Sequence, residues 1–87
     1  MPNWQPGMGV EKLPRAYRDI IEVVQDAHGP VRAKQVVPRI GLPAEVGKIE
    51  TVRAKLKRLV ARGWLEEDDP GLFTVAHHRA DGSFNSS

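Results

Sequence analysis

Residues 44–62 constrain the fold more than any other segment, because their apolar side chains recur at helical spacing. Five of them follow one another at steps of three, four, three and one residue: Ile49, Val52, Leu56, Leu59 and Val60. On an α-helix this spacing forms a stripe about 100° wide that must be buried against other elements. Gly63 is placed to cap the helix in the left-handed conformation. Gly47 weakens the first turn by about 1 kcal/mol relative to alanine.

A first helix is expected to begin near Leu13–Pro14, because proline is tolerated in a first turn. One face of this helix would be apolar, with spacings of three and four residues: Tyr17, Ile20, Ile21, Val24 and Ala27. Gly29–Pro30 should end it, since glycine adopts the left-handed cap and proline cannot continue the hydrogen-bond ladder.

A second, shorter helix is expected after Val31–Arg32, a dipeptide long enough only for a bridge or a one-residue strand. Its apolar face would be formed by Ala33, Val36, Val37 and Ile40. Pro38 conflicts with this pattern, because a proline inside a helix costs about 3 kcal/mol. The helix should therefore begin near residues 34–35 or be kinked, and a turn at residues 41–43 should follow it.

Two short strands should close the domain, at residues 64–66 and 72–75. They flank an acidic, turn-forming cluster at residues 67–71. With Leu65, Phe73 and Val75 facing inward, this hairpin would lie across the helices.

The chain of 87 residues suffices for one small α+β domain, mostly α-helical, over residues 13–76. Residues 1–12 are rich in proline and glycine and predict a flexible leader, in which Trp4 and Met8 could pack back on the domain. The polar residues 77–87 predict a disordered tail. Cysteine is absent, which excludes disulfides and thiolate metal sites. With no apolar run near the ~20 residues of a membrane span and no signal pattern at the start, a cytoplasmic location is expected.

The net charge of +2 conceals a strong separation of charge along the chain. Residues 30–63 carry nine cations and two acids, a net charge of +7, and the remaining residues carry −5. Such concentrated positive charge makes a polyanion the first partner to consider. A solvated, lysine-rich surface is the alternative. The polyanion is favoured by four cations that have no acid three or four residues away within the helix: Lys55, Lys57, Arg58 and Arg62.

Three helices followed by a hairpin is the order of a winged helix-turn-helix domain. Residues 51–65, TVRAKLKRLVARGWL, resemble the recognition helix and first wing strand of bacterial GntR regulators, whose pattern there is T-[VL]-R-x-x-L-x-R-L-x-x-x-G-[WL]-[LI]. Residues 71–75, GLFTV, resemble the G-x-[YF]-x-[VL] return strand of winged-helix domains. The resemblance covers residues 13–76.

Three features depart from that family. The turn before the third helix, at residues 41–47, is longer than the usual three or four residues. The expected wing is acidic where DNA-binding wings usually offer cations to phosphate: Glu66, Glu67, Asp68 and Asp69. A GntR regulator would also have an effector-binding domain after the wing. The acidic wing is interpreted either as a solvated turn or as a contact for a basic partner.

The resemblance implies that the third helix lies in the major groove of DNA, with its N-terminal half nearest the bases. The expected groove contacts are Lys48, Glu50, Thr51, Arg53 and Lys57. Arg53 matches the family's arginine and suits bidentate contact with guanine, and Thr51 could serve a phosphate or a thymine methyl group. Glu50 could accept a hydrogen bond from cytosine or pair with Arg53.

The remaining cations are expected to contact phosphates, which position a protein without specifying sequence. On the third helix these are Lys55, Arg58 and Arg62. At the start and end of the second helix they are Arg32, Lys34 and Arg39, for which a solvated surface is an equal alternative.

No enzyme, metal site or cofactor is expected. Every serine lies in residues 83–87, and the adjacent His77 and His78 lack the spacing of metal ligands. His28 is placed to serve the end of the first helix.

The sequence therefore predicts sequence-specific binding of double-stranded DNA through the third helix, by a nucleoid-associated transcriptional regulator or mobile-element accessory factor. A homodimer, or tandem binding on repeats, is expected because one small domain buries little DNA surface. The alternative is a protein-interaction module that uses the same scaffold without reading DNA.

Overall fold

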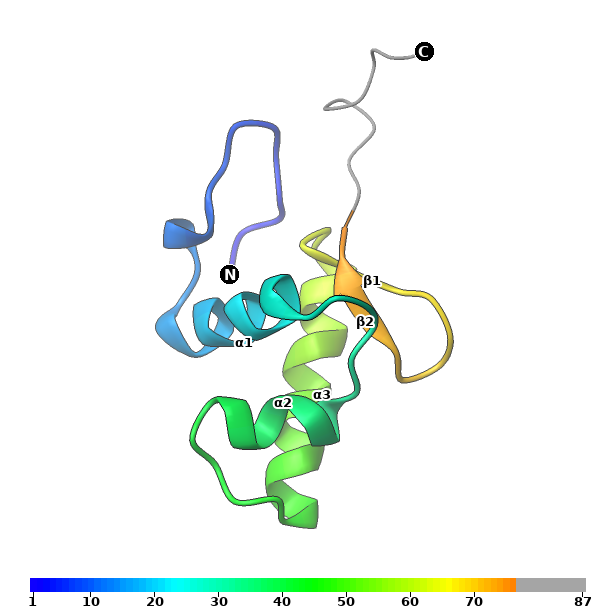
Figure 1. The fold of residues 1–87 in the computed structure, drawn as a ribbon. Coiled ribbons are helices and arrows are strands. Elements are labelled where there is room, and N and C mark those ends of the chain that lie inside the picture. The colour runs from blue at the N-terminus through cyan, green and yellow to red at the C-terminus, as the bar shows by residue number, and fades with distance from the viewer. Residues whose placement is uncertain (77–87) are drawn as a thin grey trace.

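The computed structural model describes residues 1–76 and shows three α-helices followed by a two-stranded antiparallel sheet. The elements are the short 3₁₀ helix η1 (Val10–Lys12), α1 (Arg15–Asp26), α2 (Ala33–Arg39), α3 (Val46–Ala61), β1 (Leu65–Glu67) and β2 (Phe73–Val75) (Figure 1). The expected α+β class with mostly helical content is confirmed. The expected tail at residues 77–87, with His77 and His78, lies outside the described residues.

Helix α3 has the buried stripe that its sequence predicts. Val52, Leu56 and Leu59 are buried, and Ile49 and Val60 at the edges are half-buried. The turn after the helix is closed by two hydrogen bonds, from the Gly63 N–H to the Val60 carbonyl and from the Trp64 N–H to the Leu59 carbonyl. Gly63 has a φ of 87°, so its predicted role as the left-handed cap is confirmed.

Helix α1 begins directly after Pro14, as expected, but ends earlier than its sequence suggests. Its last residue is Asp26, and Ala27 already has an extended backbone with φ −72° and ψ 144°. Gly29 has no positive φ. The prediction that Gly29 caps the helix in the left-handed conformation is wrong, because the chain has left the helix two residues earlier.

Helix α2 begins at Ala33, slightly before the predicted start, and contains Pro38 in its last turn. Only the carbonyl of Lys34 loses a helical donor to proline at this position, and the helix ends one residue later. Hydrogen bonds from the Ile40, Gly41 and Leu42 N–H groups to carbonyls of the last turn then close the segment.

The hairpin pairs Leu65 with Val75 and Glu67 with Phe73, and it is extended by an isolated bridge between Val31 and Phe73. The N–H groups of Val31 and Phe73 donate to each other's carbonyls at 2.9 and 2.8 Å. The predicted bridge at Val31 is thereby confirmed. Leu65 and Phe73 are buried, and Val75 is half-buried.

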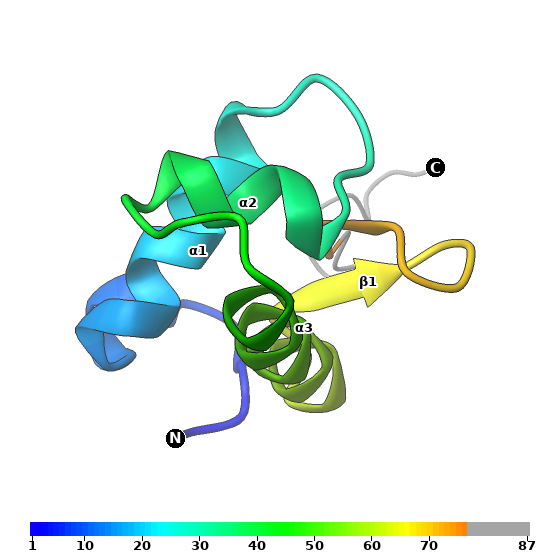
Figure 2. The ribbon, with the colours of Figure 1, turned by 90° about the horizontal axis from the view of Figure 1, so that it is seen from below.

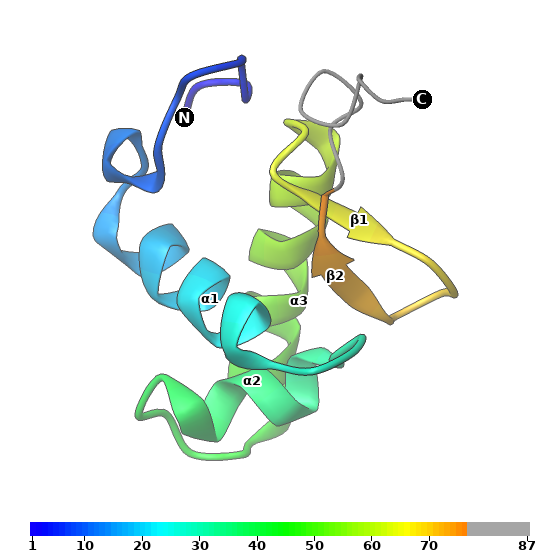
Figure 3. The same cartoon turned by 45° about the horizontal axis from the view of Figure 1, so that its top comes forward.

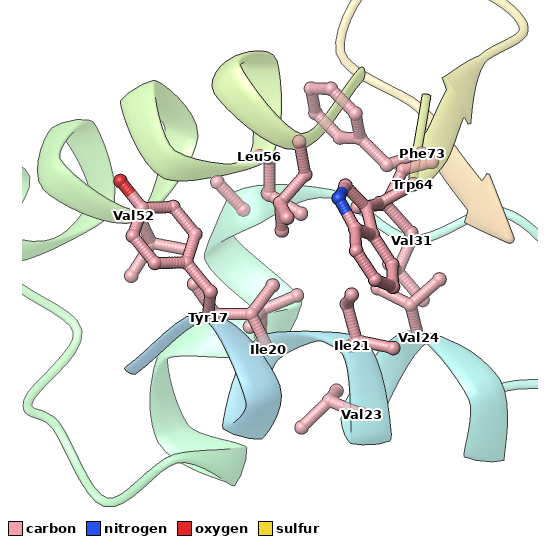
Figure 4. Packing of buried hydrophobic residues seen from close by; sticks show 14 of the residues in the cluster. Tyr17, Ile20, Ile21, Val23, Val24, Val31, Val52, Leu56, Trp64 and Phe73 are labelled. Carbon is pink, nitrogen blue, oxygen red and sulfur yellow. The ribbon is translucent and has the colours of Figure 1, made fainter. Parts of the chain in front are cut away.

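The core lies where α1, α3 and the hairpin converge. Figure 4 shows Ile21 and Val24 of α1 near Trp64, and Tyr17 projecting from α1 toward α3 beside Val52. Figures 2 and 3 show that α3 runs between α1 on one side and the sheet on the other. Two long edges of α3 therefore face different neighbours.

Residues 1–12 lie against the end of α3 and the start of the hairpin. The Trp4 N–H donates to the Arg62 carbonyl at 2.7 Å, and the Trp64 Nε1–H donates to the Pro2 carbonyl at 3.0 Å. Trp4 and Met8 pack against the buried core, as the sequence allowed. In the part of the chain described, no helix has both the length and the apolar character that crossing a bilayer requires.

Candidate nucleic-acid interface

The polar side chains of α3 form two rows, one on each side of its outer surface. At about 100° per residue, four residues share the edge that faces the sheet, here named the hairpin-side row: Val46, Glu50, Arg53 and Lys57. Five share the opposite edge, here named the α1-side row: Lys48, Thr51, Lys55, Arg58 and Arg62. The structure thus divides the predicted site residues of this helix between two edges.

Between the two rows, the outermost line of α3 carries only small residues. Gly47, Ala54 and Ala61 are each exposed and follow one another at intervals of seven residues, so they nearly align along the helix. The backbone of α3 is consequently accessible along this line, with longer side chains rising on both sides of it.

The cations of the hairpin-side row are paired with acids yet stay exposed. Arg53 forms an ion pair with Glu50 one turn earlier, and its side chain is 41% exposed. Lys57, whose side chain is 54% exposed, pairs with Glu67 of β1, its Nζ lying 2.9 Å from each carboxylate oxygen. Lys57 has no acid three or four residues away on the helix, as the sequence shows, but the hairpin folds back and supplies Glu67 as its partner.

Glu67 joins the helix to the hairpin turn. Besides Lys57, it accepts a hydrogen bond from the Gly71 N–H at 2.7 Å, and its side chain is 17% exposed. The hydrogen bond from Gly71, followed by that from Lys57, lowers the pKa of the Glu67 carboxyl group. Both contacts favour the ionised carboxylate, which therefore holds the turn and Lys57 together.

The α1-side row rests on Tyr17 of α1. The Arg58 Nη1–H donates to the Tyr17 hydroxyl at 3.3 Å, and the Lys55 Nζ lies 5.7 Å from the centre of the tyrosine ring. Tyr17 is 9% exposed, so a buried side chain of α1 supports two cationic side chains of α3.

Further along this row, Arg62 donates to the Asn3 side-chain oxygen at 3.3 Å, and Lys48 is exposed in the first turn. Thr51 donates its hydroxyl to the Gly47 carbonyl at 2.9 Å, which leaves its oxygen free to accept. Across residues 1–76, none of the four cations of this row forms an ion pair. The row therefore presents an uncompensated charge of +4.

The expected phosphate contacts on α2 are also exposed. The backbone N–H of Arg32 donates to the Gln35 side chain at 2.7 Å at the start of the helix, and Lys34 is exposed in its first turn. Arg39 lies 3.9 Å from Asp26 of α1 in a loose pair.

The hairpin turn is acidic and exposed at its tip. Asp68 and Asp69 close the turn through two backbone hydrogen bonds with Leu72, at 3.0 and 2.8 Å, and their side chains face solvent. The tip thus offers no cation to a phosphate backbone. Residues 1–76 also contain no group of three or more His, Cys, Asp or Glu side chains that could hold a metal ion.

Sequence reasoning missed three residues of this surface. Tyr17 was assigned to the core only, and Glu67 to the turn, because both contacts join segments distant in sequence. Val46 is not among the predicted site residues, although its place on the hairpin-side row follows from helical spacing alone.

Comparisons of the chain with protein-family models, with curated proteins and with solved structures found no match.

Proposed function

We propose that this chain is a winged helix-turn-helix protein that binds double-stranded DNA through α3 in the major groove. The observation that carries the proposal is the pair of polar rows flanking a line of small residues on α3. A B-DNA major groove is about 12 Å wide, and an α-helix with its side chains is about 10–12 Å across. A helix whose outer line is small can approach the base edges while its flanking side chains reach both strands.

The two rows suit different roles. The α1-side row carries +4 without ion pairs, so it supplies attraction to phosphates through Lys48, Lys55, Arg58 and Arg62. In the hairpin-side row, Glu50 and Arg53 are already oriented toward each other. A carboxylate and a guanidinium held together match the donor and acceptor pattern of cytosine and guanine edges. This row would therefore specify sequence.

Arg32, which precedes α2, and Lys34 in its first turn add phosphate contacts beside the groove, and the acidic hairpin tip stays outside it. A single domain of this size buries about 600–1,000 Å² on DNA. Specific binding would therefore involve a homodimer or adjacent copies on repeated sites. The role that fits is that of a small transcriptional regulator or mobile-element accessory factor associated with the nucleoid.

A protein-interaction module is the second candidate, and the acidic tip favours it. Asp68 and Asp69 are exposed at the end of the hairpin and could meet a basic surface. In that case α3 would need no access to DNA, and neutralising its cations would leave the interaction at the hairpin unchanged.

Fluorescence anisotropy of a labelled random duplex tests the proposal. Between about 50 and 200 mM salt, four to six phosphate contacts should reduce affinity roughly 10²–10³-fold. The double variant Lys55→Gln/Arg58→Gln should lower the log–log salt slope by about 1.8, since each phosphate contact contributes about 0.9. The matched control Lys12→Gln/Arg15→Gln removes two exposed cations outside the rows. Absence of binding at low salt, or equal slopes in both double variants, would overturn the proposal.

A further inference from the structure

We propose that Val46 recognises thymine, by packing its side chain against the C5-methyl group in the major groove. The inference rests on the proposed function and adds to it the identity of one base in the bound sequence. Among the described residues 1–76, Val46 is the one large hydrophobic side chain that is exposed, at 77%. It is also the first residue of α3.

The position of Val46 indicates what kind of group could cover it. It shares the hairpin-side row with Glu50 and Arg53, one and two turns further along, and Glu45 precedes it. An apolar side chain set among charged ones suits a partner that is polar apart from one small apolar group. The major groove is such a surface, because the thymine methyl is the apolar group among its donors and acceptors.

The spacing along α3 turns this contact into a sequence expectation. Val46 and Arg53 are seven residues apart, which corresponds to about 10 Å at a rise of 1.5 Å per residue. Base pairs are stacked about 3.4 Å apart. Because a helix in the major groove runs obliquely to the stacking direction, a thymine read by Val46 should lie within about three base pairs of a guanine read by Arg53.

Replacing thymine by uracil in a selected site tests the inference, because the change removes only the methyl group. Sites are first selected from a random duplex pool, and each thymine is then replaced singly. For the unaltered protein, one replacement should weaken binding about four-fold, the factor expected for one buried methyl group. For Val46→Ser, which replaces the apolar side chain by a polar one, thymine and uracil at that position should bind equally well, and uracil at flanking thymines should change nothing.

The outcomes separate this inference from the proposed function. If duplex DNA binds but no thymine is sensitive, or if Val46→Ser keeps the sensitivity, the inference is wrong and DNA binding stands. If no duplex binds, the proposed function is wrong, and the inference about Val46 fails with it. Sedimentation velocity without DNA provides a second check: self-association that Val46→Ser abolishes would assign the side chain to a protein contact and overturn the inference. Circular dichroism confirms that each variant is folded.

Discussion

Replacing Tyr17 by phenylalanine should destabilise the protein by about 0.5–1 kcal/mol, because it removes one hydrogen bond and keeps the ring. The bond removed is that from Arg58 to the tyrosine hydroxyl, at 3.3 Å. A hydrogen bond contributes about 0.5–1.5 kcal/mol net. The long distance and the exposed arginine place this one in the lower half of that range. The cation–π contact with Lys55 should survive, since it needs only the ring.

Replacing Tyr17 by leucine removes the ring as well. The loss of the contact with Lys55 and of buried aromatic volume should cost roughly a further 1–2 kcal/mol. Urea unfolding followed by tryptophan fluorescence measures both variants, with an unchanged slope showing that the unfolding reaction is the same.

A double-mutant cycle isolates the contact between α1 and α3. Tyr17→Phe and Arg58→Ala should show a coupling free energy of about 0.5 kcal/mol or more, because each variant removes the same bond. Tyr17→Phe with Lys12→Ala is the matched control and should show none, since Lys12 is exposed outside the rows. Equal coupling in the two cycles would refute the view that Tyr17 anchors the α1-side row.

Three further predictions concern the stability of the fold. Gly47→Ala should stabilise it by about 0.5–1 kcal/mol, since a Cβ there meets no atom within 4 Å; Gly63→Ala, at a φ of 87°, should destabilise it by about 1–2 kcal/mol. Thermal unfolding of the two variants should therefore shift in opposite directions, and shifts of the same sign would contradict this. The lowered pKa of Glu67 means that its contribution is fully present above the ordinary glutamate pKa and is lost as pH falls through the folded value. Urea unfolding at about pH 7 and pH 3 should then show a smaller loss of stability at the acidic pH in Glu67→Gln than in the unaltered protein, and equal losses would count against the contacts of Glu67 with Gly71 and Lys57. Leu56→Ala, at a fully buried position, should cost about 2–5 kcal/mol in the same assay, and a cost below about 1 kcal/mol would mean that α3 is not packed as described.

The sequence predicts those parts of the fold that depend on local spacing. The buried stripe of α3 and its cap at Gly63 follow from helical periodicity and from the freedom of glycine at positive φ. Gly29 shows the limit of the same reasoning. A glycine near a helix end is permitted to cap it, but here the chain leaves the helix after Asp26 and runs on to the bridge between Val31 and Phe73.

The sequence predicts most residues of the candidate site, but it does not predict which side chains contact one another. Lys57 has no acid near it on the helix. Its partner Glu67 lies ten residues away in the sequence, on β1, which folds back against α3. Tyr17 and Arg58 are separated by 41 residues. Helical spacing cannot find such contacts, because they depend on how α1, α3 and the hairpin pack. Helical spacing alone places Val46 on the hairpin-side row, but the predicted contacts were chosen among polar and charged side chains, and valine is neither.

The most direct test of the proposed function is a nuclear magnetic resonance titration of the protein with a short duplex at low salt. Chemical shift changes should concentrate on α3, from Val46 to Arg58, and at the start of α2, on Arg32 and Lys34. The hairpin tip at residues 68–70 should stay nearly unchanged. Changes confined to that tip, or no changes on α3 at concentrations where the duplex is bound, would contradict the placement of α3 in the major groove.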